Sequence, residues 1–288
     1  MNPYRIFTDS SSDIREELLC EWGVSAAQLT LRFLKDGDEH ENRDVRPPEL
    51  YRRMRSGESA ATSAVAVGGF VTLFERALSA GEDVLYIGFS SALSGTYNGA
   101  CVAARQLAAR YPERRICTLD SLSASAGLGL LVHLAVKAKR EGRTLDELLV
   151  YLEGMRHRIV HLFTVDDLAY LARGGRIGRT SAAVGNLLGI KPVLHVDASG
   201  RLVAVERVRG RRAAISALCE RYGRMHDDVL RTPIYVSHAD DPDAAGALCA
   251  LLEENYGVTP DLITDVGPVI GAHAGPGTLA LFFVGSSR

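Results

Sequence analysis

Short apolar runs alternate with amphipathic stretches of helix length along the chain. In the first half, apolar runs of strand length occur at 4–8, 24–34, 83–89 and 115–121. Stretches with helical periodicity lie between and after them, at 14–23, 47–57, 69–81, 94–111, 126–142 and 144–158. This order predicts an α/β fold with largely parallel sheets.

Polar residues stand where two of these helices are expected to begin. Ser12 or Asp13 precedes the helix at 14–23, and Thr144 precedes the helix at 144–158. Side-chain oxygens of these residue types accept hydrogen bonds from the free amides of a first helical turn. We therefore expect them to act as N-caps.

The second half begins a new series of strands and helices. A strand is expected at 159–165, a helix at 180–189, and a hairpin at 190–208 whose two strands are joined by Asp-Ala-Ser-Gly. The remaining predicted elements are helices at 211–225 and 241–257, strands at 232–239, 261–267 and 280–285, and a loop at 268–279. No internal repeat or low-complexity linker interrupts the pattern.

The length of the chain favours two domains. Its 288 residues exceed the usual size of one compact domain. The change from helix to strand near 155–160 places the boundary between them. We predict two α/β domains, covering 1–157 and 158–288.

Composition excludes several classes of protein. The formal net charge of −2 gives no electrostatic footprint for nucleic acid. The five scattered cysteines favour reduced thiols over a disulfide scaffold or a thiolate zinc site. The N-terminal sequence lacks the apolar core of a signal peptide, and no apolar run is long enough to span a bilayer. A cytoplasmic location is expected.

Four polar, glycine-rich loops lie at the predicted ends of strands, at 8–13, 61–69, 90–96 and 271–278. In open α/β sheets, ligands collect outside the carboxyl ends of the strands. Loops of Gly, Ser and Thr supply amides and hydroxyls that converge on an anion. The pattern favours a small-molecule anion site, although each loop can equally be explained by turns and helix caps.

The loop at 90–96 raises the alternative of a catalytic serine. A nucleophile elbow requires G-x-S-x-G, but alanine follows at the second glycine position, in Gly88-Phe89-Ser90-Ser91-Ala92. Because triads assemble in space, Ser91 or Ser94 with His273 remains an open alternative. His273 lies between Pro268 and Pro276 and can instead present an N–H group to a ligand carboxylate or phosphate.

Nucleotide and metal motifs are absent from the sequence. It contains no P-loop, and Gly271–Gly277 does not match G-x-G-x-x-G. The histidines are scattered, so no metal site is predicted. Asp9 and Asp13 are interpreted as a turn former and a helix cap.

Two arginine-rich segments have two interpretations. Arg173, Arg176 and Arg179 form one, and four arginines between 207 and 212 form the other. They are either solvated surface charges or a patch for phosphate or for an acidic partner.

The order and spacing of several segments resemble the DegV family of fatty-acid-binding proteins, which act as subunits of bacterial fatty acid kinase. The resemblance spans nearly the whole chain. Its segments are IFTDSSSDI, TSAV, SSALSGTY, DDLAYLARGGRIG, LLGIKPVL, VERVRGRRAA and GPVIGAHAGPGTLALFFVG. Ala64 and Val65 depart from the Gln-Pro that is usual in the family.

The resemblance implies a fatty acid held between two α/β domains. Its carboxylate would meet residues matching the family's loops, which are Thr62, Ser63, Ser94, Gly95, Thr96, His273 and Gly275. A separate ATP-dependent kinase subunit would phosphorylate the bound carboxylate. Arg173, Arg176 and Arg209 would face that partner or the transferred phosphoryl group.

This resemblance implies a lipid-binding subunit with no complete active site, no cofactor and transient membrane contact. Two alternatives stay open. One is a self-sufficient hydrolase or acyltransferase that uses Ser94 or Ser91 with His273. The other is a lipid-sensing regulator that binds a protein through its arginines.

Overall fold

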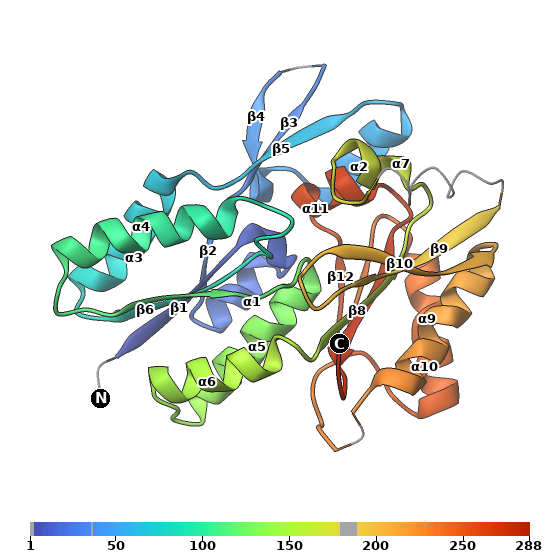
Figure 1. The fold of residues 1–288 in the computed structure, drawn as a ribbon. Coiled ribbons are helices and arrows are strands. Elements are labelled where there is room, and N and C mark those ends of the chain that lie inside the picture. The colour runs from blue at the N-terminus through green and yellow to red at the C-terminus, as the bar shows by residue number, and fades with distance from the viewer. Residues whose placement is uncertain (1–2, 36, 179–188, 228) are drawn as a thin grey trace.

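The computed structural model describes residues 3–35, 37–178, 189–227 and 229–288. It confirms the α/β fold, with helices packed on three β-sheets (Figure 1). The helix predicted at 180–189 lies, except for residue 189, outside the described residues.

The four-stranded sheet is formed by the first half of the chain and is parallel throughout. Its strand order is β2-β1-β6-β7, with β1 at Tyr4–Asp9, β2 at Ser25–Ala27, β6 at Asp83–Gly88 and β7 at Ile116–Asp120. Helices α3 (Val67–Ser79) and α4 (Thr96–Arg110) pack on this sheet. The carboxyl ends of β1 and β6 therefore bring the loops at 8–13 and 88–96 to one edge.

The six-stranded sheet comes from the second half and is mostly antiparallel. Its order is β10-β9-β8-β13-β11-β12, and only β11 and β12 are parallel. The strands are β8 (Ile159–Thr164), β9 (Ile190–Val196), β10 (Leu202–Arg209), β11 (Tyr235–His238), β12 (Leu262–Asp265) and β13 (Leu279–Val284). The expectation of largely parallel sheets is wrong here, because β9 and β10 form a hairpin and β13 runs antiparallel between β8 and β11.

A three-stranded antiparallel sheet is not predicted by the sequence pattern. Its order is β4-β3-β5, with β3 at Thr30–Phe33, β4 at Glu39–Glu41 and β5 at Ala60–Ser63. The apolar run at 24–34 is therefore two strands, β2 and β3, in different sheets. The small residues around 60–63 conceal a strand because most of them lack the β-branched and aromatic side chains that mark one.

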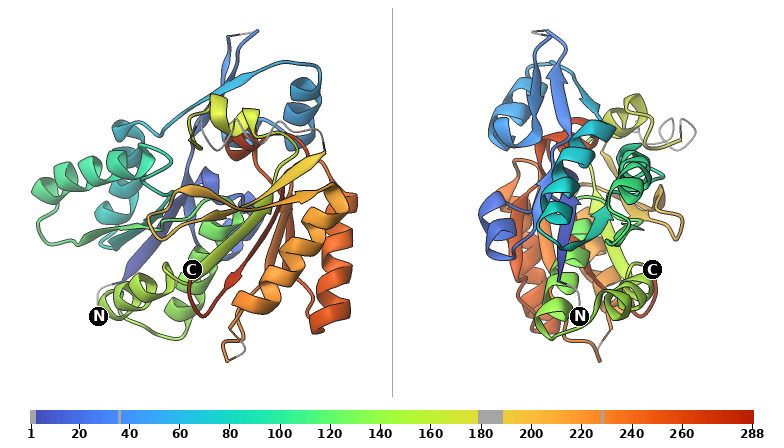
Figure 2. Two further views of the ribbon diagram at one scale, coloured as in Figure 1. Left: turned by 45° about the vertical axis from the view of Figure 1, so that its right-hand side comes forward. Right: turned by 90° about the vertical axis from the view of Figure 1, so that its left-hand side faces the viewer.

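Helix α5 (Ala126–Arg140) lies between the two larger sheets (Figures 1 and 2). It contacts β1 and β6 of one sheet and β8, β11 and β13 of the other. Most of its residues are buried, as expected for a helix that is apolar on nearly every face. Gly127 permits this close packing, because a Cβ atom there would overlap the imidazole of His161 on β8.

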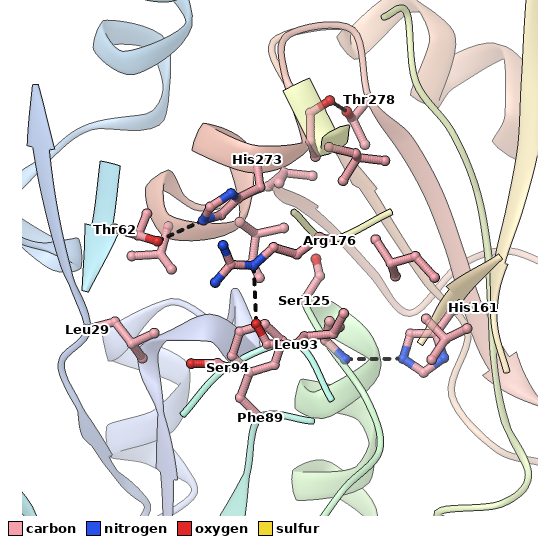
Figure 3. A pocket seen from close by; sticks show the side chains of 18 of the residues that line it. Leu29, Thr62, Phe89, Leu93, Ser94, Ser125, His161, Arg176, His273 and Thr278 are labelled. Atoms are coloured by element: carbon pink, nitrogen blue, oxygen red, sulfur yellow. Dashed lines mark hydrogen bonds between the residues drawn. The ribbon is translucent and has the colours of Figure 1, made fainter. Parts of the chain in front are cut away.

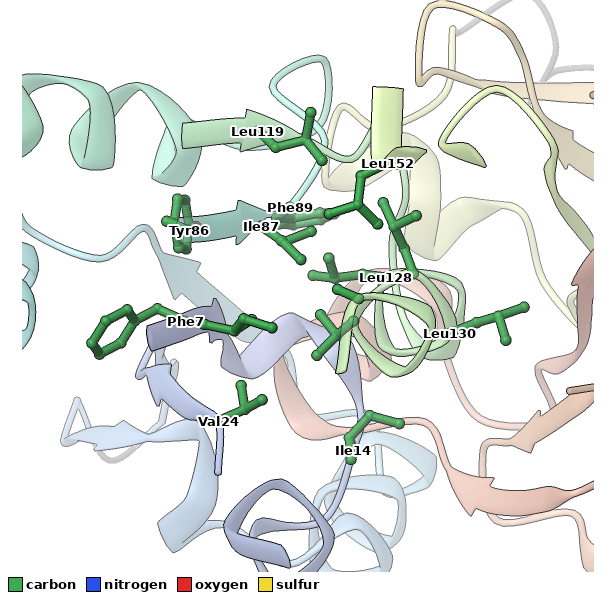
Figure 4. Packing of buried hydrophobic residues seen from close by; sticks show 14 of the residues in the cluster. Phe7, Ile14, Val24, Tyr86, Ile87, Phe89, Leu119, Leu128, Leu130 and Leu152 are labelled. Carbon is green, nitrogen blue, oxygen red and sulfur yellow. The ribbon is translucent and has the colours of Figure 1, made fainter. Parts of the chain in front are cut away.

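The largest apolar core extends across this arrangement. Leu128 of α5 points toward Ile87 of β6 (Figure 4), and the same cluster includes Phe7 of β1, Leu130 of α5 and Phe282 of β13. Helices α9 (Arg211–Met225) and α10 (Pro242–Tyr256) cover the other face of the six-stranded sheet with a second core.

A third core joins the small sheet to the second half of the chain. Leu31 and Tyr51 pack with Val266 and Ala272. Tyr51 belongs to α2 (Pro47–Arg55), and Ala272 belongs to α11 (Pro268–Ala274). The boundary at 157/158 stays a prediction, and this core lies across it.

The remaining elements are short or peripheral. They are α1 (Glu16–Glu21), α6 (Leu145–Met155), α7 (Ala169–Arg173) and the 3₁₀ turns at Ser10–Ser12 and Asn42–Asp44.

The structure shows which of the predicted N-cap residues cap a helix. Thr144 caps α6 in a capping box with Glu147, as expected. Neither Ser12 nor Asp13 caps α1, whose N-cap is Arg15 without a side-chain bond. Asp13 instead has a left-handed backbone, with φ +53°, and a buried carboxyl group.

Candidate functional site

A largely apolar cavity of about 910 Å³ lies among β5, α11, β13, the β9–β10 hairpin and the loop after β6 (Figure 3). Both halves of the chain contribute to its wall. Its apolar lining includes Leu29, Phe89, Leu93, Phe163, Leu171, Val196, Leu202, Val266, Val269, Ile270 and Phe282.

Polar side chains gather in one region of this wall. Thr62 of β5 and His273 of α11 are hydrogen-bonded, with 2.7 Å between Oγ1 and Nε2. Ser94 and Arg176 lie near this pair (Figure 3). An apolar cavity with polar groups clustered in one region suits a ligand with a long apolar part and one polar end.

Helix α11 holds His273 in this position. The sequence predicts a loop here, and that prediction is wrong: Pro268 occupies the first helical turn, where proline is favoured. The side chain of Asn42 accepts a hydrogen bond from the Val269 amide at 2.9 Å. The Tyr51 hydroxyl donates to the Val266 carbonyl at 2.5 Å, just before the helix.

The imidazole of His273 is uncharged at neutral pH. Burial, with a smaller effect from the positive charge of Arg176, lowers its pKa to about 4. A neutral ring keeps one nitrogen as an acceptor, so the Thr62 hydroxyl and His273 can exchange donor and acceptor roles.

Arg176 is half-buried at the cavity wall. Its Nε donates to the Leu93 carbonyl at 3.2 Å, and Nη1 donates to the Gly174 carbonyl at 2.5 Å. Burial lowers the pKa of its guanidinium from the usual value. Among the described residues no carboxylate forms an ion pair with Arg176. A desolvated cation without a counter-ion favours binding of an anion.

Asp9 fixes the start of the serine loop after β6. Its carboxylate accepts hydrogen bonds from the Tyr86 hydroxyl at 2.6 Å and from the Phe89 amide at 2.9 Å. It also accepts from the Ser11 amide at 3.1 Å, which confirms its role as a turn former, here as the cap of the 3₁₀ turn. Burial raises the pKa of Asp9, and these bonds oppose the rise.

Five of the seven residues predicted for the carboxylate line the cavity, namely Thr62, Ser63, Ser94, Gly95 and His273. The other two, Thr96 and Gly275, each follow a residue that lines the cavity. Thr96 is buried at the start of α4, with Oγ1 2.9 Å from the Ser94 hydroxyl, and Gly275 follows α11.

The three arginines predicted to face a partner occupy different places. Arg176 lines the cavity itself. Arg173 is exposed at the end of α7, with its guanidinium 4.6 Å from the centre of the Tyr170 ring. Arg209 is exposed at the end of β10 and does not line the cavity.

The sequence pattern does not single out much of the cavity wall. Ala124, Ser125 and His161 line it, although no local motif marks them. Ser125 has φ +53°, an unusual value for a residue other than glycine, and its hydroxyl donates to Asp13 at 2.5 Å. Ala64 also lines the cavity, so the departure from Gln-Pro changes the wall directly.

The serines considered as nucleophiles have other partners. Ser90 is fully buried and donates to the Gly200 carbonyl at 2.9 Å, whereas Ser91 is exposed. Ser94 bonds Thr96, and His273 bonds Thr62. Within the described ranges, His273 therefore does not form a hydrogen-bonded pair with any of these serines.

The described residues contain no group of three or more His, Cys, Asp or Glu side chains arranged to hold a metal ion. They also contain no helix with the length and apolar character needed to cross a bilayer.

Comparisons of sequence identify relatives over the whole chain. Residues 3–286 match the family described as "Uncharacterised protein, DegV family". A DegV domain-containing protein of Clostridium perfringens is 36% identical, and the alignment covers 100% of this chain and 99% of that protein.

Solved structures show the same fold. A DegV family protein from Thermus thermophilus, described for its fatty acid binding, is 30% identical with a TM-score of 0.85, covering 98% of this chain and 99% of that one. DegV of Bacillus subtilis, described as a fatty acid binding protein, is 27% identical with a TM-score of 0.84 over the same shares.

Proposed function

Because the chain belongs to the DegV family, we propose that it binds a long-chain fatty acid in the cavity of about 910 Å³. The single observation that carries this proposal is the pairing of an apolar cavity with Arg176, a half-buried cation with no carboxylate partner among the described residues. Binding of fatty acids by the Thermus and Bacillus relatives supports it.

The apolar wall accounts for affinity. Each buried CH₂ group contributes about 0.8 kcal/mol, so a sixteen-carbon chain offers on the order of 11–12 kcal/mol of gross transfer free energy. Loss of ligand motion and desolvation of the carboxylate reduce this amount. The carboxylate itself needs hydrogen-bond donors, because an unpaired buried anion is costly.

Thr62, Ser94, His273 and Arg176 are the donors that we assign to the carboxylate. Arg176 supplies the positive charge, and the two hydroxyl groups donate hydrogen bonds to the charged carboxylate. A carboxylate beside His273 would also raise the pKa of this imidazole from its value of about 4 in the free protein. Ser63, Gly95, Thr96 and Gly275 shape the backbone around these donors.

We further propose that the chain presents the carboxylate to a separate ATP-dependent kinase subunit. A second hollow of about 850 Å³ shares Thr62, Arg176 and His273 with the cavity and is also lined by Tyr170 and Arg173. A phosphoryl donor in this hollow would therefore lie next to the carboxylate site.

In the proposed reaction, one carboxylate oxygen attacks the γ-phosphorus of ATP. The bond between that phosphorus and the oxygen bridging to the β-phosphate breaks, and ADP leaves with that oxygen. Arg173 would stabilise the transferring phosphoryl group, and Arg209 would contact the partner. Closure of the site would protect the acyl phosphate from water. A cytoplasmic location and transient exchange of lipid with a membrane are parts of the same proposal.

Reversing the charge of Arg173 tests the kinase role. With ATP and the kinase subunit of a bacterial fatty acid kinase, the wild type loaded with palmitate is expected to form acyl phosphate, trapped as the hydroxamate. Arg173→Glu is expected to lower this rate at least about a hundredfold, because a charge that stabilises phosphoryl transfer becomes repulsive. Palmitate affinity should stay within about twofold, because Arg173 lies outside the cavity lining.

Arg173→Lys is the matched control and should retain part of the rate. Equal rates for the wild type and Arg173→Glu would remove Arg173 from the reaction. Tight palmitate binding without any acyl phosphate from the wild type would overturn the kinase role and leave fatty acid binding intact.

A further inference from the structure

The β9–β10 hairpin forms part of the cavity wall. Val196, the last residue of β9, and Leu202, the first residue of β10, are paired across the hairpin, and both line the cavity. Val196 is fully buried and Leu202 is half-buried. The turn between them thus places two branched apolar side chains against the ligand space.

This pair belongs to the part of the cavity wall beside His161, opposite Thr62 and His273. The neighbouring residue His195 pairs with Leu162 of β8, next to His161. Figure 3 shows His161 across the pocket from Thr62 and His273. A ligand whose carboxylate meets Thr62 and His273 would therefore direct its tail toward the hairpin.

Ser90 anchors the hairpin tip to the first half of the chain. Its buried hydroxyl donates to the carbonyl of Gly200, in the turn, at 2.9 Å. Gly200 has φ +78°, and a Cβ atom there would overlap the Ser90 hydroxyl. The turn therefore fits closely against the serine loop whose later residues are assigned to the carboxylate.

Arg288 provides a second anchor on the same side. Its Nη1 donates to the carbonyl of Leu122 at 2.9 Å and to that of Asp197 at 3.4 Å. The hairpin turn is thereby joined to the loop that carries Ala124 and Ser125, which also line the cavity. Two independent contacts thus hold the hairpin turn against the loops that carry Ser90 and Leu122.

From these contacts we infer that the hairpin tip is the stop for the acyl chain: Leu202 and Val196 set the longest chain that fits, and Ser90 is the positioning residue that holds them. This inference rests on the proposed fatty acid binding and adds the selection of chain length. A chain that exceeds the stop must displace the tip, whereas a shorter one loses about fourfold in affinity per missing CH₂.

Competition among fatty acids tests the stop. Delipidated wild type, Leu202→Ala and Leu202→Phe are each incubated with an equimolar mixture of even-numbered saturated fatty acids, from about twelve to twenty carbons, and the bound species are read by native mass spectrometry. Leu202→Ala is expected to lengthen the preferred chain by about two carbons, because it removes three carbons from the wall. Leu202→Phe is expected to shorten it.

Val205→Ala is the matched control, because Val205 is on the same strand, is 39% exposed and does not line the cavity. The chain lengths that Val205→Ala binds should match those of the wild type.

If Leu202→Phe does not fold, Val196→Ala replaces it, and a longer preferred chain is expected. Unchanged chain preference in folded Leu202 and Val196 variants would overturn the stop while fatty acid binding stands. A wild type that takes up no fatty acid would overturn the proposed function as well.

The positioning role of Ser90 is tested by the range of chain lengths that the protein binds in the same competition experiment. Ser90→Ala is expected to admit longer chains and broaden the distribution, since the tip loses its hydrogen bond, and Ser90→Thr, which keeps the hydroxyl, should restore selection. Ser91→Ala is the control, because Ser91 is exposed. A wild-type distribution in Ser90→Ala would show that Ser90 does not hold the stop.

Discussion

Replacing Arg176 with methionine is expected to weaken fatty acid binding about a hundredfold and to leave binding of the fatty alcohol of the same chain length within about twofold. Removing one partner of a buried, hydrogen-bonded charge pair costs about 2–5 kcal/mol, because the other charge is left unpaired. The alcohol carries no charge, so it loses little. Methionine preserves most of the apolar volume of the arginine stem.

Ser94→Ala and His273→Ala should also weaken binding of the fatty acid more than binding of the fatty alcohol. The loss of fatty acid affinity is expected to be smaller, about tenfold for each variant, because each removes one hydrogen bond to a charged group. Arg173→Met is the control for loss of an arginine nearby, since Arg173 is exposed and outside the cavity lining. Binding is measured by titration calorimetry or displacement of a fluorescent fatty acid. An equal loss for acid and alcohol in Arg176→Met would mean that Arg176 supports the fold of the site rather than the carboxylate.

Replacing Asp13 with asparagine is expected to change how stability depends on pH. The Asp13 carboxyl group is buried, with the Ser125 hydroxyl donating to it at 2.5 Å. Burial raises its pKa to about 8, and the negative charges of Asp265 and Asp9 act in the same direction. The Ser125 bond opposes the rise.

The direction of the effect follows from the two protonation states. In the unfolded chain an Asp carboxyl group has a pKa of about 3.9, so between about pH 4 and pH 8 the folded protein binds the extra proton. The contribution of Asp13 to the free energy of unfolding is fully present below about pH 4 and is lost as pH rises to about 8. A loss of a few kcal/mol is expected, because each tenfold change in the affinity of a carboxylate for its proton corresponds to about 1.4 kcal/mol.

Urea unfolding at pH 5 and pH 9 measures this contribution as the difference between wild type and variant. Asp13→Asn carries no titratable group, so its stability relative to the wild type should rise by a few kcal/mol from pH 5 to pH 9. Asp38→Asn, at an exposed carboxylate, is the control and should show no such change. A constant difference between Asp13→Asn and the wild type across this range would contradict a buried, protonated Asp13.

The polar end of the cavity is largely predictable because its residues stand in recognisable loops at the ends of strands. Ser94 follows β6, and the parallel order of β1 and β6 brings their loops together, as the alternation of strands and helices predicts. Thr62 is identified through the resemblance, although the strand that carries it is not. His273 is identified as a residue, but the sequence does not predict the helix that orients it.

That helix shows why the local pattern is insufficient there. α11 has only seven residues, contains Gly271 and is flanked by Gly267 and Gly275, so the segment resembles a loop. Its position depends on Tyr51 and Asn42, which are more than 200 residues away in sequence. Such contacts determine a short helix, whereas intrinsic propensity does not.

The tail end of the cavity is not predictable for a related reason. The sequence predicts the hairpin at 190–208, but nothing in it indicates that the hairpin tip meets Ser90 from the first half of the chain. Ser125 gives no signal either, because its left-handed backbone and its bond to Asp13 arise from tertiary packing. Ser90, which stands at the serine position of the incomplete elbow motif, has a structural partner.

Native mass spectrometry of the wild type, purified from bacteria without added lipid, tests the central claim of fatty acid binding most directly. We expect a complex heavier than the chain by the mass of a fatty acid, which denaturation releases and solvent extraction identifies as a free long-chain acid. A clean mass of the chain alone, with no lipid in the extract and no uptake when palmitate is added, would contradict fatty acid binding.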